Sequence, residues 1–256
     1  MTLILTGIGH FPMIEPGANL SELICMALHE SDIQLQKNDI LIVTQKIVSK
    51  AENRLVNLTT VDPSQEALDL ALLVNKDPRL VELVLGESKK VIRAAKNVLI
   101  VEHKLGFICA NAGIDHSNVS GPWGSQSDWV LLLPENPDAS ARSIRDEIEK
   151  QASINRIGVM IIDSHSRAWR VGTVGTAIGL AGVPGIVDLR GTSDIYGYKM
   201  QYTIISAADE LAAAASLVMG QIDERIPVVH ARGFPYPLRE SRLREMLRPE
   251  ETDLFR

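Results

Sequence analysis

The residues best suited to chemistry lie in the segment 111–119, which reads Asn-Ala-Gly-Ile-Asp-His-Ser-Asn-Val. It follows an apolar run at residues 106–110, and such a run predicts the end of a buried strand. Asp115 stands at the centre of the loop, among short side chains that donate and accept hydrogen bonds. Because a loop at the end of a buried strand is where a rigid scaffold usually presents binding groups, we predict that Asp115 belongs to a site.

A second apolar run, residues 156–162, leads directly into Asp163 and Ser164. Two aspartates at strand ends could hold one hard cation between them, because Mg²⁺ and Mn²⁺ prefer carboxylate oxygens. The alternative is that each aspartate simply caps a turn, which is a common role for this residue. The two interpretations make different demands on the fold, since only the first requires the carboxylates to lie close together.

Basic residues accompany these carboxylates. Lys46 and Lys50 lie in a segment, 45–50, that we expect to be a polar loop after a buried strand, and Arg167 and Arg170 follow Asp163. Carboxylates with lysine and arginine suit nucleotide-driven ligation, in which cations neutralise charge on a transferred phosphoryl group. For each basic residue the alternative is a solvated surface position.

Several common sites are excluded by their missing motifs. The sequence contains neither G-x-x-x-x-G-K-[ST] nor G-x-G-x-x-G, so it supports neither a P-loop nor a Rossmann dinucleotide site. A G-x-S-x-G elbow is also absent. Ser164 and His165 are neighbours on an extended chain and should point to opposite faces, which disfavours a nucleophilic pair. We interpret His10, His103 and His230 as ordinary, partly buried histidines.

Composition narrows the class of protein. The chain has 256 residues, 45% of them hydrophobic and 23% charged, which is an ordinary globular balance. Its net charge of −6 argues against a nucleic-acid partner, which would need a basic face. Cys25 and Cys109 each lie in an apolar run, so we expect them to be reduced and buried. The first residues read as a strand rather than a signal peptide, and no apolar run reaches the ~18 residues of a membrane span, so we expect a cytoplasmic protein without a membrane partner.

The predicted elements mix helices and strands without strict β-α-β alternation, which favours a mixed α/β, α+β-like fold in one domain, residues 1–256. Helices are expected after Asn19, after the Asp62-Pro63 and Asp77-Pro78 pairs, and at residues 139–152, 207–219 and 239–256. Glycines at spacings of three and four across residues 171–185 predict a segment that other backbones approach closely. Strands are expected at residues 3–8, 39–44, 89–104 (one or two), 106–110, 130–133, 156–162, 200–206 and 226–231.

Segments 111–119, 163–172 with the glycine-rich run that follows, and 45–50 resemble the coenzyme F420-0:L-glutamate ligases. The resemblance extends from Ile4 to about Gly233 and rests mainly on the nine-residue block at 111–119. It implies a family-specific fold of two intertwined lobes, neither Rossmann nor P-loop. It also implies a homodimer with the nucleotide site near the subunit interface.

The resemblance implies an activity as well. Members of the family join L-glutamate to the carboxylate end of the deazaflavin coenzyme F420-0 and add further γ-linked glutamates. They use GTP and Mg²⁺ or Mn²⁺, with K⁺ as a further candidate cation. The implied path is phosphorylation of the acceptor carboxylate, followed by attack of the glutamate amine on the acyl phosphate.

Carried over by position, Asp115 and Asp163 resemble ligands of a first metal, and Ser164 resembles a ligand of a second. Gln221 stands where some members carry glutamate as a further ligand of the second metal, and its amide has only one neutral oxygen to offer a metal. We add Arg167 and Arg170 to the catalytic candidates, because guanidinium groups bind polyanionic substrates in a fixed fork geometry. The residues that resemble GTP contacts are Phe11, Pro12, Met13, Ile14, Gln45, Lys46, Lys50, Asn118, Met219, Gly220, Gln221, Ile222, Asp223, Glu224, Arg225 and Ile226.

Two other functions fit the same residues. One is a γ-glutamyl ligase for another carboxylate such as a folate, since nothing in the sequence selects a deazaflavin over a pterin. The other is a non-catalytic relative that binds a nucleotide or a flavin-like ligand, which the glutamine at position 221 keeps open.

Overall fold

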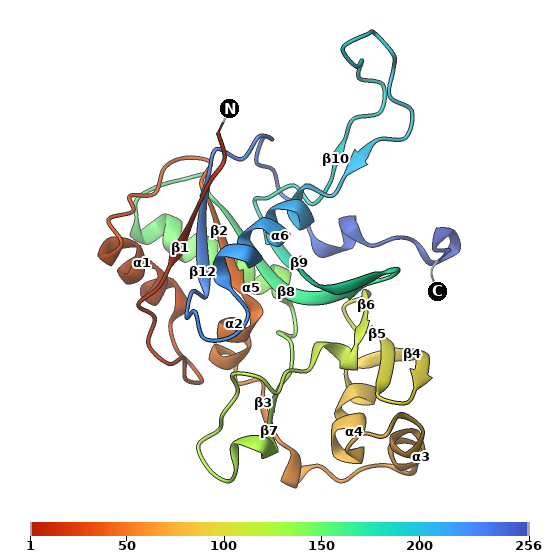
Figure 1. Ribbon diagram of the computed structural model, residues 1–256. Coiled ribbons are helices and arrows are strands. Elements are labelled where there is room, and N and C mark those ends of the chain that lie inside the picture. The colour runs from red at the N-terminus through yellow and green to blue at the C-terminus, as the bar shows by residue number, and fades with distance from the viewer. Residues whose placement is uncertain (1, 255–256) are drawn as a thin grey trace.

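The computed structural model describes residues 2–254 and has the predicted mixed α/β fold. Its centre is a five-stranded sheet in the order β1-β12-β2-β8-β9 (Figure 1). These strands are β1 (Ile4–Ile8), β12 (Val228–Arg232), β2 (Ile40–Thr44), β8 (Gly158–Arg167) and β9 (Arg170–Ala181). Only β2 and β8 pair in parallel, and the other neighbours in the sheet are antiparallel.

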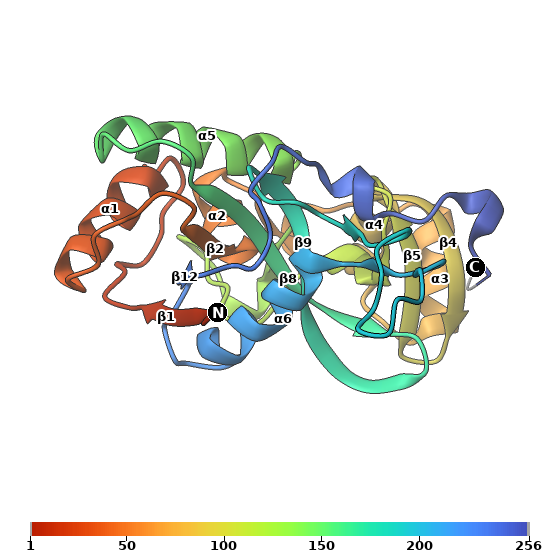
Figure 2. The same cartoon turned by 90° about the horizontal axis from the view of Figure 1, so that it is seen from above.

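Helices cover both faces of this sheet (Figure 2). On one face α1 (Leu20–Glu30) and α5 (Pro137–Gln151) pack against Leu41 and Val43 of β2. On the other face α6 (Ala207–Met219) packs against Ile40 and Ile42 of the same strand. Successive side chains of a strand point to opposite faces, so one short apolar strand supplies both halves of the core. We call this sheet with its helices the large lobe.

The glycines of β9 allow the two helix layers to approach the sheet closely. A Cβ on Gly175 would lie 2.5 Å from the carbonyl oxygen of Ala212 in α6. A Cβ on Gly179 would lie 2.5 Å from the backbone of Pro137 in α5. Because real Cβ atoms are not found this close, the predicted tight packing of the glycine-rich segment is confirmed.

A small lobe is inserted between β3 (Leu55–Asn57) and β7 (Trp129–Leu131), which pair with each other at its base. It contains helices α3 (Gln65–Val74) and α4 (Pro78–Gly86). These pack on a three-stranded antiparallel sheet of β4 (Ser88–Ala95), β5 (Val98–His103) and β6 (Ile108–Ala110). The lobe has its own core, which includes Val74, Val81 and Leu99. The segment 111–119 leaves this lobe after β6 and runs back towards the large lobe.

An arm formed by residues 187–205 projects from the large lobe (Figure 1). Its base is the short antiparallel pair β10 (Val187–Asp188) and β11 (Ile204–Ile205). Ile195, Tyr196 and Tyr202 on the arm are about nine-tenths exposed, at 90%, 89% and 87%. Such large apolar side chains gathered on one projecting segment are typical of a surface that meets a partner.

The structure also corrects several sequence predictions. Residues 45–50, expected as a loop, form helix α2 (Gln45–Ala51). The strand expected to end at residue 162 continues to Arg167, so Asp163 lies within β8 rather than after it. The helix expected after Asp62 begins at Gln65 and is capped by Ser64, and the strand expected at 200–206 shrinks to β11.

The predicted C-terminal helix at 239–256 was wrong for the residues described. Only two short 3-10 turns form there, Leu243–Met246 and Glu250–Thr252, and residues 255–256 lie outside the described part of the chain. Pro249 separates the turns, and a proline inside a helix removes a hydrogen bond and clashes with the preceding turn. Of the described helices, none is both long and apolar enough to cross a membrane.

Candidate functional site

A cavity of about 740 Å³ is lined by both lobes. The large lobe contributes the loop after β1, helix α2, strands β8 and β9, and the loop after α6, and the segment 109–126 closes the remaining side. The predicted site residues that line the cavity are Phe11, Pro12, Met13, Ile14, Lys46, Lys50, Asp115, Asn118, Asp163, Ser164, Met219, Gly220, Gln221, Ile222, Asp223, Glu224, Arg225 and Ile226.

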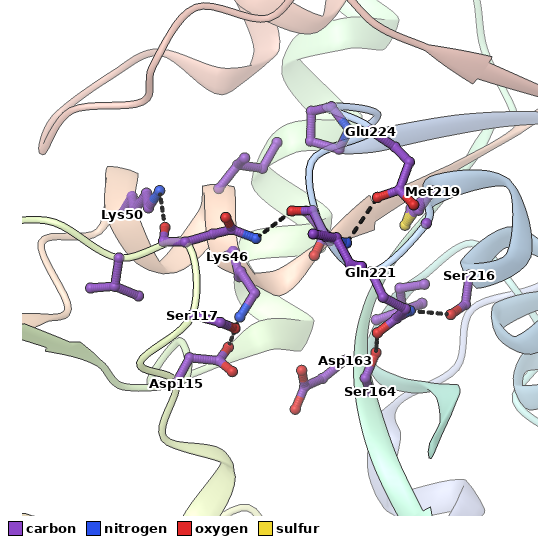
Figure 3. A pocket seen from close by; sticks show the side chains of 18 of the residues that line it. Lys46, Lys50, Asp115, Ser117, Asp163, Ser164, Ser216, Met219, Gln221 and Glu224 are labelled. Atoms are coloured by element: carbon purple, nitrogen blue, oxygen red, sulfur yellow. Dashed lines mark hydrogen bonds and ion pairs between the residues drawn. The ribbon is translucent and has the colours of Figure 1, made fainter. Parts of the chain in front are cut away.

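Asp115 is fixed by both its backbone and its side chain. Its backbone exchanges two hydrogen bonds with Leu131 of β7, at N···O distances of 3.0 and 2.9 Å. Gln45 Nε2 donates to Asp115 Oδ2 at 2.6 Å. Lys46 forms an ion pair with the same oxygen (Figure 3). Burial raises the pKa of Asp115, the nearby Lys46 ammonium opposes that rise, and the negative charge of Asp163 adds to it. The carboxylate is therefore held in place and coupled electrostatically to the second aspartate.

Gln45, a predicted GTP contact, does not line the cavity. It is fully buried at the first turn of α2, where Ser49 Oγ donates to its Oε1 at 2.8 Å. An amide whose oxygen already accepts a hydrogen bond must present its nitrogen in the other direction. Gln45 thus holds the Asp115 carboxylate in position without lining the cavity itself.

Asp163 faces the same cavity from β8. Its Oδ2 lies 2.9 Å from His165 Nε2, and the His165 ring packs against Phe107 with centroids 4.9 Å apart. The Asp163 charge also contributes to the pKa of Cys109, which burial, the larger cause, and this charge together raise to about 12. Asp163 and Asp115 line the same cavity, as the shared-site interpretation requires.

Neutral side chains continue the wall beyond Asp163. Ser164 Oγ donates to Gln221 Oε1 at 3.1 Å, and Gln221 Nε2 donates to Ser216 Oγ at 3.1 Å (Figure 3). Gly220, which ends α6, has a φ of +73°, and a Cβ there would lie 2.0 Å from Glu224 Cδ. Glycine is the residue that tolerates both conditions, so the turn brings Gln221 to Ser164.

Two hydrogen bonds that share Asn118 span the opening of the cavity. Lys50 Nζ donates to the carbonyl oxygen of Asn118 at 2.9 Å, and Asn118 Nδ2 donates to the carbonyl oxygen of Ile222 at 2.8 Å (Figure 3). Burial is the main reason that the pKa of Lys50 is lowered, with the positive charge of Lys46 as a second cause. These two hydrogen bonds join α2, the segment 111–119 and the loop after α6.

Arg167 and Arg170 do not line the cavity. They are opposite each other at the end of the β8–β9 hairpin, where Arg170 is exposed. Conversely, sequence reasoning missed lining residues on the same hairpin, His165, Ser166 and Thr173. The alternation of Ser164 and Ser166 was the available signal, because residues two apart on a strand share a face.

The oxygen-rich character of the site fits a hard divalent cation. Oδ1 of Asp115 and Oδ1 of Asp163 accept no hydrogen bond from any residue in the range 2–254. Among those same residues, no group of three or more His, Cys, Asp or Glu side chains forms a metal cluster. The lining carries four carboxylates, on Asp115, Asp163, Asp223 and Glu224, against the three basic groups of Lys46, Lys50 and Arg225. A polyanion bound here would therefore benefit from additional positive charge, and oxygen ligands suit Mg²⁺ or Mn²⁺.

Comparison with known proteins identifies the family. The sequence matches the family described as F420-0:gamma-glutamyl ligase over residues 9–233. The chain belongs to this family. Every residue that lines the cavity, from Phe11 to Pro227, lies within the matched range, so the cavity is built entirely from the part of the chain that F420-0:gamma-glutamyl ligases share.

Individual family members align with most of the chain. The coenzyme F420:L-glutamate ligase of Methanothermobacter thermautotrophicus is 42% identical over 258 residues, with 100% of both chains covered. The protein of the same name from Methanocaldococcus jannaschii is 40% identical, covering 93% of this chain and 90% of its own. That from Methanopyrus kandleri is also 40% identical, covering 95% and 93% respectively. The similarity therefore spans both lobes rather than one segment.

Proposed function

We propose that the protein is a GTP-dependent ligase that joins L-glutamate to coenzyme F420-0 and adds further γ-linked glutamates. The observation that carries this proposal is the convergence of Asp115 and Asp163 on one cavity, in a chain similar over its length to coenzyme F420:L-glutamate ligases. Lys46 and Lys50 line the same space and would attract the nucleotide phosphates.

In the first step an oxygen of the acceptor carboxylate attacks the γ-phosphorus of GTP. The new P–O bond forms as the bond to the β-phosphate oxygen breaks, which gives an acyl phosphate and GDP. This step needs charge neutralisation and alignment more than covalent help from the protein. Lys46 and Lys50 provide positive charge near the phosphates, and the Gln45–Asp115 hydrogen bond keeps the Asp115 carboxylate from rotating.

In the second step the amine of L-glutamate attacks the acyl carbon. The C–N bond forms, the amine loses a proton to solvent, and inorganic phosphate leaves with the carboxylate oxygen that attacked GTP. A cavity lined by both lobes favours this sequence, because limiting the access of water protects an acyl phosphate from hydrolysis.

Asp115 and Asp163 would hold a divalent cation, with Ser164 and Gln221 as neutral candidate ligands. When bound, Mg²⁺ or Mn²⁺ would polarise phosphoryl oxygens and neutralise the charge that develops on them. The fit rests on the free Oδ1 atoms of both aspartates and on the excess of carboxylates over basic side chains along the lining. The proposed function makes no use of Arg167 or Arg170.

We also propose a homodimer, supported by the exposed aromatic side chains of the projecting arm. A second copy of the chain would cover Tyr196 and Tyr202, which are 89% and 87% exposed. Light scattering on the purified protein and on a Tyr196→Ser/Tyr202→Ser variant tests this. We expect a dimer that weakens in the variant, and a wild-type monomer at micromolar concentration would contradict it.

The activity is tested by mass spectrometry after incubation with F420-0, GTP, L-glutamate and Mn²⁺. We expect products heavier by one or more glutamyl residues, with one GDP and one phosphate for each amide formed. An acceptor labelled with ¹⁸O in its carboxylate should transfer one label to the released phosphate. ATP in place of GTP, and folate in place of F420-0, serve as controls for nucleotide and acceptor.

Each negative result of these assays would point to a different correction of the proposed function. Amide formation with folate but not with F420-0 would assign the protein to another γ-glutamyl ligase activity. GTP binding without turnover of either acceptor would indicate a non-catalytic relative. Phosphate without ¹⁸O would exclude the acyl phosphate while leaving the ligase activity in place.

A further inference from the structure

Each of the two aspartates in the cavity has one oxygen atom beside a protein group and one oxygen atom free. Gln45 Nε2 donates to Asp115 Oδ2, and His165 Nε2 lies 2.9 Å from Asp163 Oδ2. The Oδ1 atoms of both aspartates accept no hydrogen bond from any residue in the range 2–254. In Figure 3 the Asp163 carboxylate points towards Asp115. His165 therefore stands to Asp163 as Gln45 stands to Asp115.

His165 reaches Asp163 because residues two apart on a strand share a face. This face of β8 is directed towards the small lobe, where the His165 ring packs against Phe107. Ser164 lies between them in the sequence and points the opposite way, to Gln221 after α6. His165 Nε2 is buried and has no hydrogen bond of standard geometry within residues 2–254. Its contact with the Asp163 carboxylate is thus the polar interaction that compensates for its burial.

Phe107 fixes the His165 ring from the small lobe. It lies in the turn between β5 and β6, and its ring contacts that of His165 at a centroid distance of 4.9 Å and stacks on that of His103 at 5.2 Å. Within this turn the His103 N–H donates to the Phe107 carbonyl oxygen at 2.9 Å, and the Leu105 N–H donates to His103 Nδ1 at 2.9 Å. His103 is buried. Phe107 therefore has a fixed place in the small lobe, and its contact with His165 joins the two lobes.

The C-terminal segment also contacts this turn from the large lobe. The Leu243 N–H donates to Asp138 of α5 at 3.1 Å, which anchors the segment on the large lobe. Farther along the segment, Leu247 Cδ1 lies 2.8 Å from the position that a Cβ on Gly106 would take. The turn that carries Phe107 is therefore in contact with the large lobe at two places, β8 and the C-terminal segment.

We propose that His165 is a positioning residue for Asp163, with Phe107 holding its ring from the small lobe. The imidazole N–H keeps Oδ2 of Asp163 in place and leaves Oδ1 for the divalent cation of the proposed function, on which this inference rests. Loss of a group that orients a ligating carboxylate typically lowers metal affinity about 10- to 100-fold. The cation site therefore depends on contact between the two lobes.

The test is the affinity for Mn²⁺, measured by calorimetry without nucleotide, of wild type, His165→Leu and His165→Gln. Leucine keeps an apolar contact with Phe107 but has no N–H, so Mn²⁺ binding should weaken about 10- to 100-fold. Glutamine keeps an N–H donor and should restore most of the affinity. His29→Leu is the matched control and should bind Mn²⁺ as wild type does, because His29 lies in α1, is exposed and does not line the cavity.

Phe107→Leu tests the ring contact while leaving His165 in place, so it remains informative if His165→Leu does not fold. Loss of one aromatic contact should lower the affinity for Mn²⁺ roughly two- to tenfold. GDP affinity measured in the presence of EDTA should be unchanged in all of these variants, because none of the substituted residues is a proposed nucleotide contact.

Binding of Mn²⁺ requires no turnover, so the experiment separates this inference from the proposed function. If wild type binds Mn²⁺ but forms no amide, the proposed function fails, and the His165 variants still test the positioning role. Unchanged Mn²⁺ affinity in folded His165→Leu, an equal loss in His165→Gln, or wild-type protein that binds no Mn²⁺ would overturn the inference. Weaker binding of GDP to His165→Leu in EDTA would place His165 beside the nucleotide and overturn it as well.

Discussion

The two walls of the cavity differ in the kind of contact that holds their side chains in place. On the wall formed by α2 and the segment 111–119, the contacts involve charged side chains: Lys46 pairs with Asp115, and Lys50 donates to the Asn118 carbonyl. On the wall formed by β8 and the loop after α6, neutral groups are joined through Ser164, Gln221 and Ser216 at 3.1 Å. The charged groups of the first wall have partners within the protein, whereas the second wall is closed by neutral hydrogen bonds that a ligand can replace.

This difference suggests how the site is completed. Charge-assisted hydrogen bonds are stronger than neutral ones, so the first wall keeps its geometry before substrate arrives. The neutral bonds of the second wall cost less to exchange for phosphate or cation oxygens. One side-chain hydrogen bond, from Asn118 to Ile222, joins the two walls across the mouth. We infer that the first wall positions the substrates and that the second adjusts to them.

The largest effect is expected when either aspartate loses its charge. Asp115→Asn and Asp163→Asn should each lower kcat/KM by at least about 10²-fold, because each removes a charged group from the proposed centre of phosphoryl transfer. The product assay for amide formation measures this directly. Both carboxylates face the cavity rather than the hydrophobic core, so the circular dichroism spectrum and melting temperature should change little.

Each aspartate variant also distinguishes the two walls. Asp115→Asn leaves Lys46 without its ion-pair partner, whereas Asp163→Asn leaves the first wall unchanged. If one variant kept near-normal turnover while folded, its carboxylate would have no place in the proposed cation site.

Lys50→Ala should have the next largest effect, on nucleotide affinity. Removing an ammonium group from beside the proposed phosphate position should weaken GDP binding roughly tenfold at low salt. The loss should shrink as ionic strength rises, since salt screens a cation–phosphate contact that is only half-buried. Calorimetric titrations at two salt concentrations measure both quantities. Equal affinity of wild type and variant at low salt would return Lys50 to the solvated-surface interpretation.

Loss of the hydrogen bond from Asn118 to Ile222, which joins the two walls, should have a smaller effect on nucleotide affinity, and this effect should not depend on salt. Asn118 has a φ of 57°, so Asn118→Gly removes the side chain while keeping a backbone that tolerates this conformation. GDP affinity should fall about two- to fivefold, because one neutral hydrogen bond is lost. Since no charge changes, the ratio to wild type should be the same at low and high salt. A salt dependence equal to that of Lys50→Ala would show that Asn118 acts only through Lys50.

Local patterns in the sequence predicted much of this arrangement. Helix α6 was expected at its observed bounds, 207–219, and the buried strand β2 was expected within one residue. The close approach at Gly175 and Gly179 follows from glycine spacing alone. These features depend on residues within one or two turns of each other, and such signals are present in a single sequence.

Features that depend on distant residues could not be predicted in the same way. The Gln45–Asp115 hydrogen bond joins residues 70 apart, and the β3–β7 pair that frames the small lobe is equally non-local. Helix α2 has only seven residues, too few to show a helical period, so its polar sequence suggested a loop. Strand β8 passes through Ser164, His165 and Ser166, whose polarity hid the continuing strand.

The smallest expected effect, and the most direct test of the neutral hydrogen bonds on the second wall, comes from Gln221→Glu. A glutamate would bring a full negative charge to the position where Gln221 offers only an amide oxygen, and it would replace the Nε2–H that donates to Ser216. The second wall would then carry an additional negative charge next to Ser164. We expect the variant to bind Mn²⁺ more tightly than wild type when no nucleotide is present, but only by a few fold because residue 221 is exposed. With GDP present the difference should narrow, since phosphate oxygens supply negative charge to both proteins. Calorimetric titration of Mn²⁺ into both proteins, with and without GDP, measures all four affinities. Two equal metal sites in nucleotide-free wild type, or no gain from the added carboxylate, would show that Gln221 only turns the chain after α6.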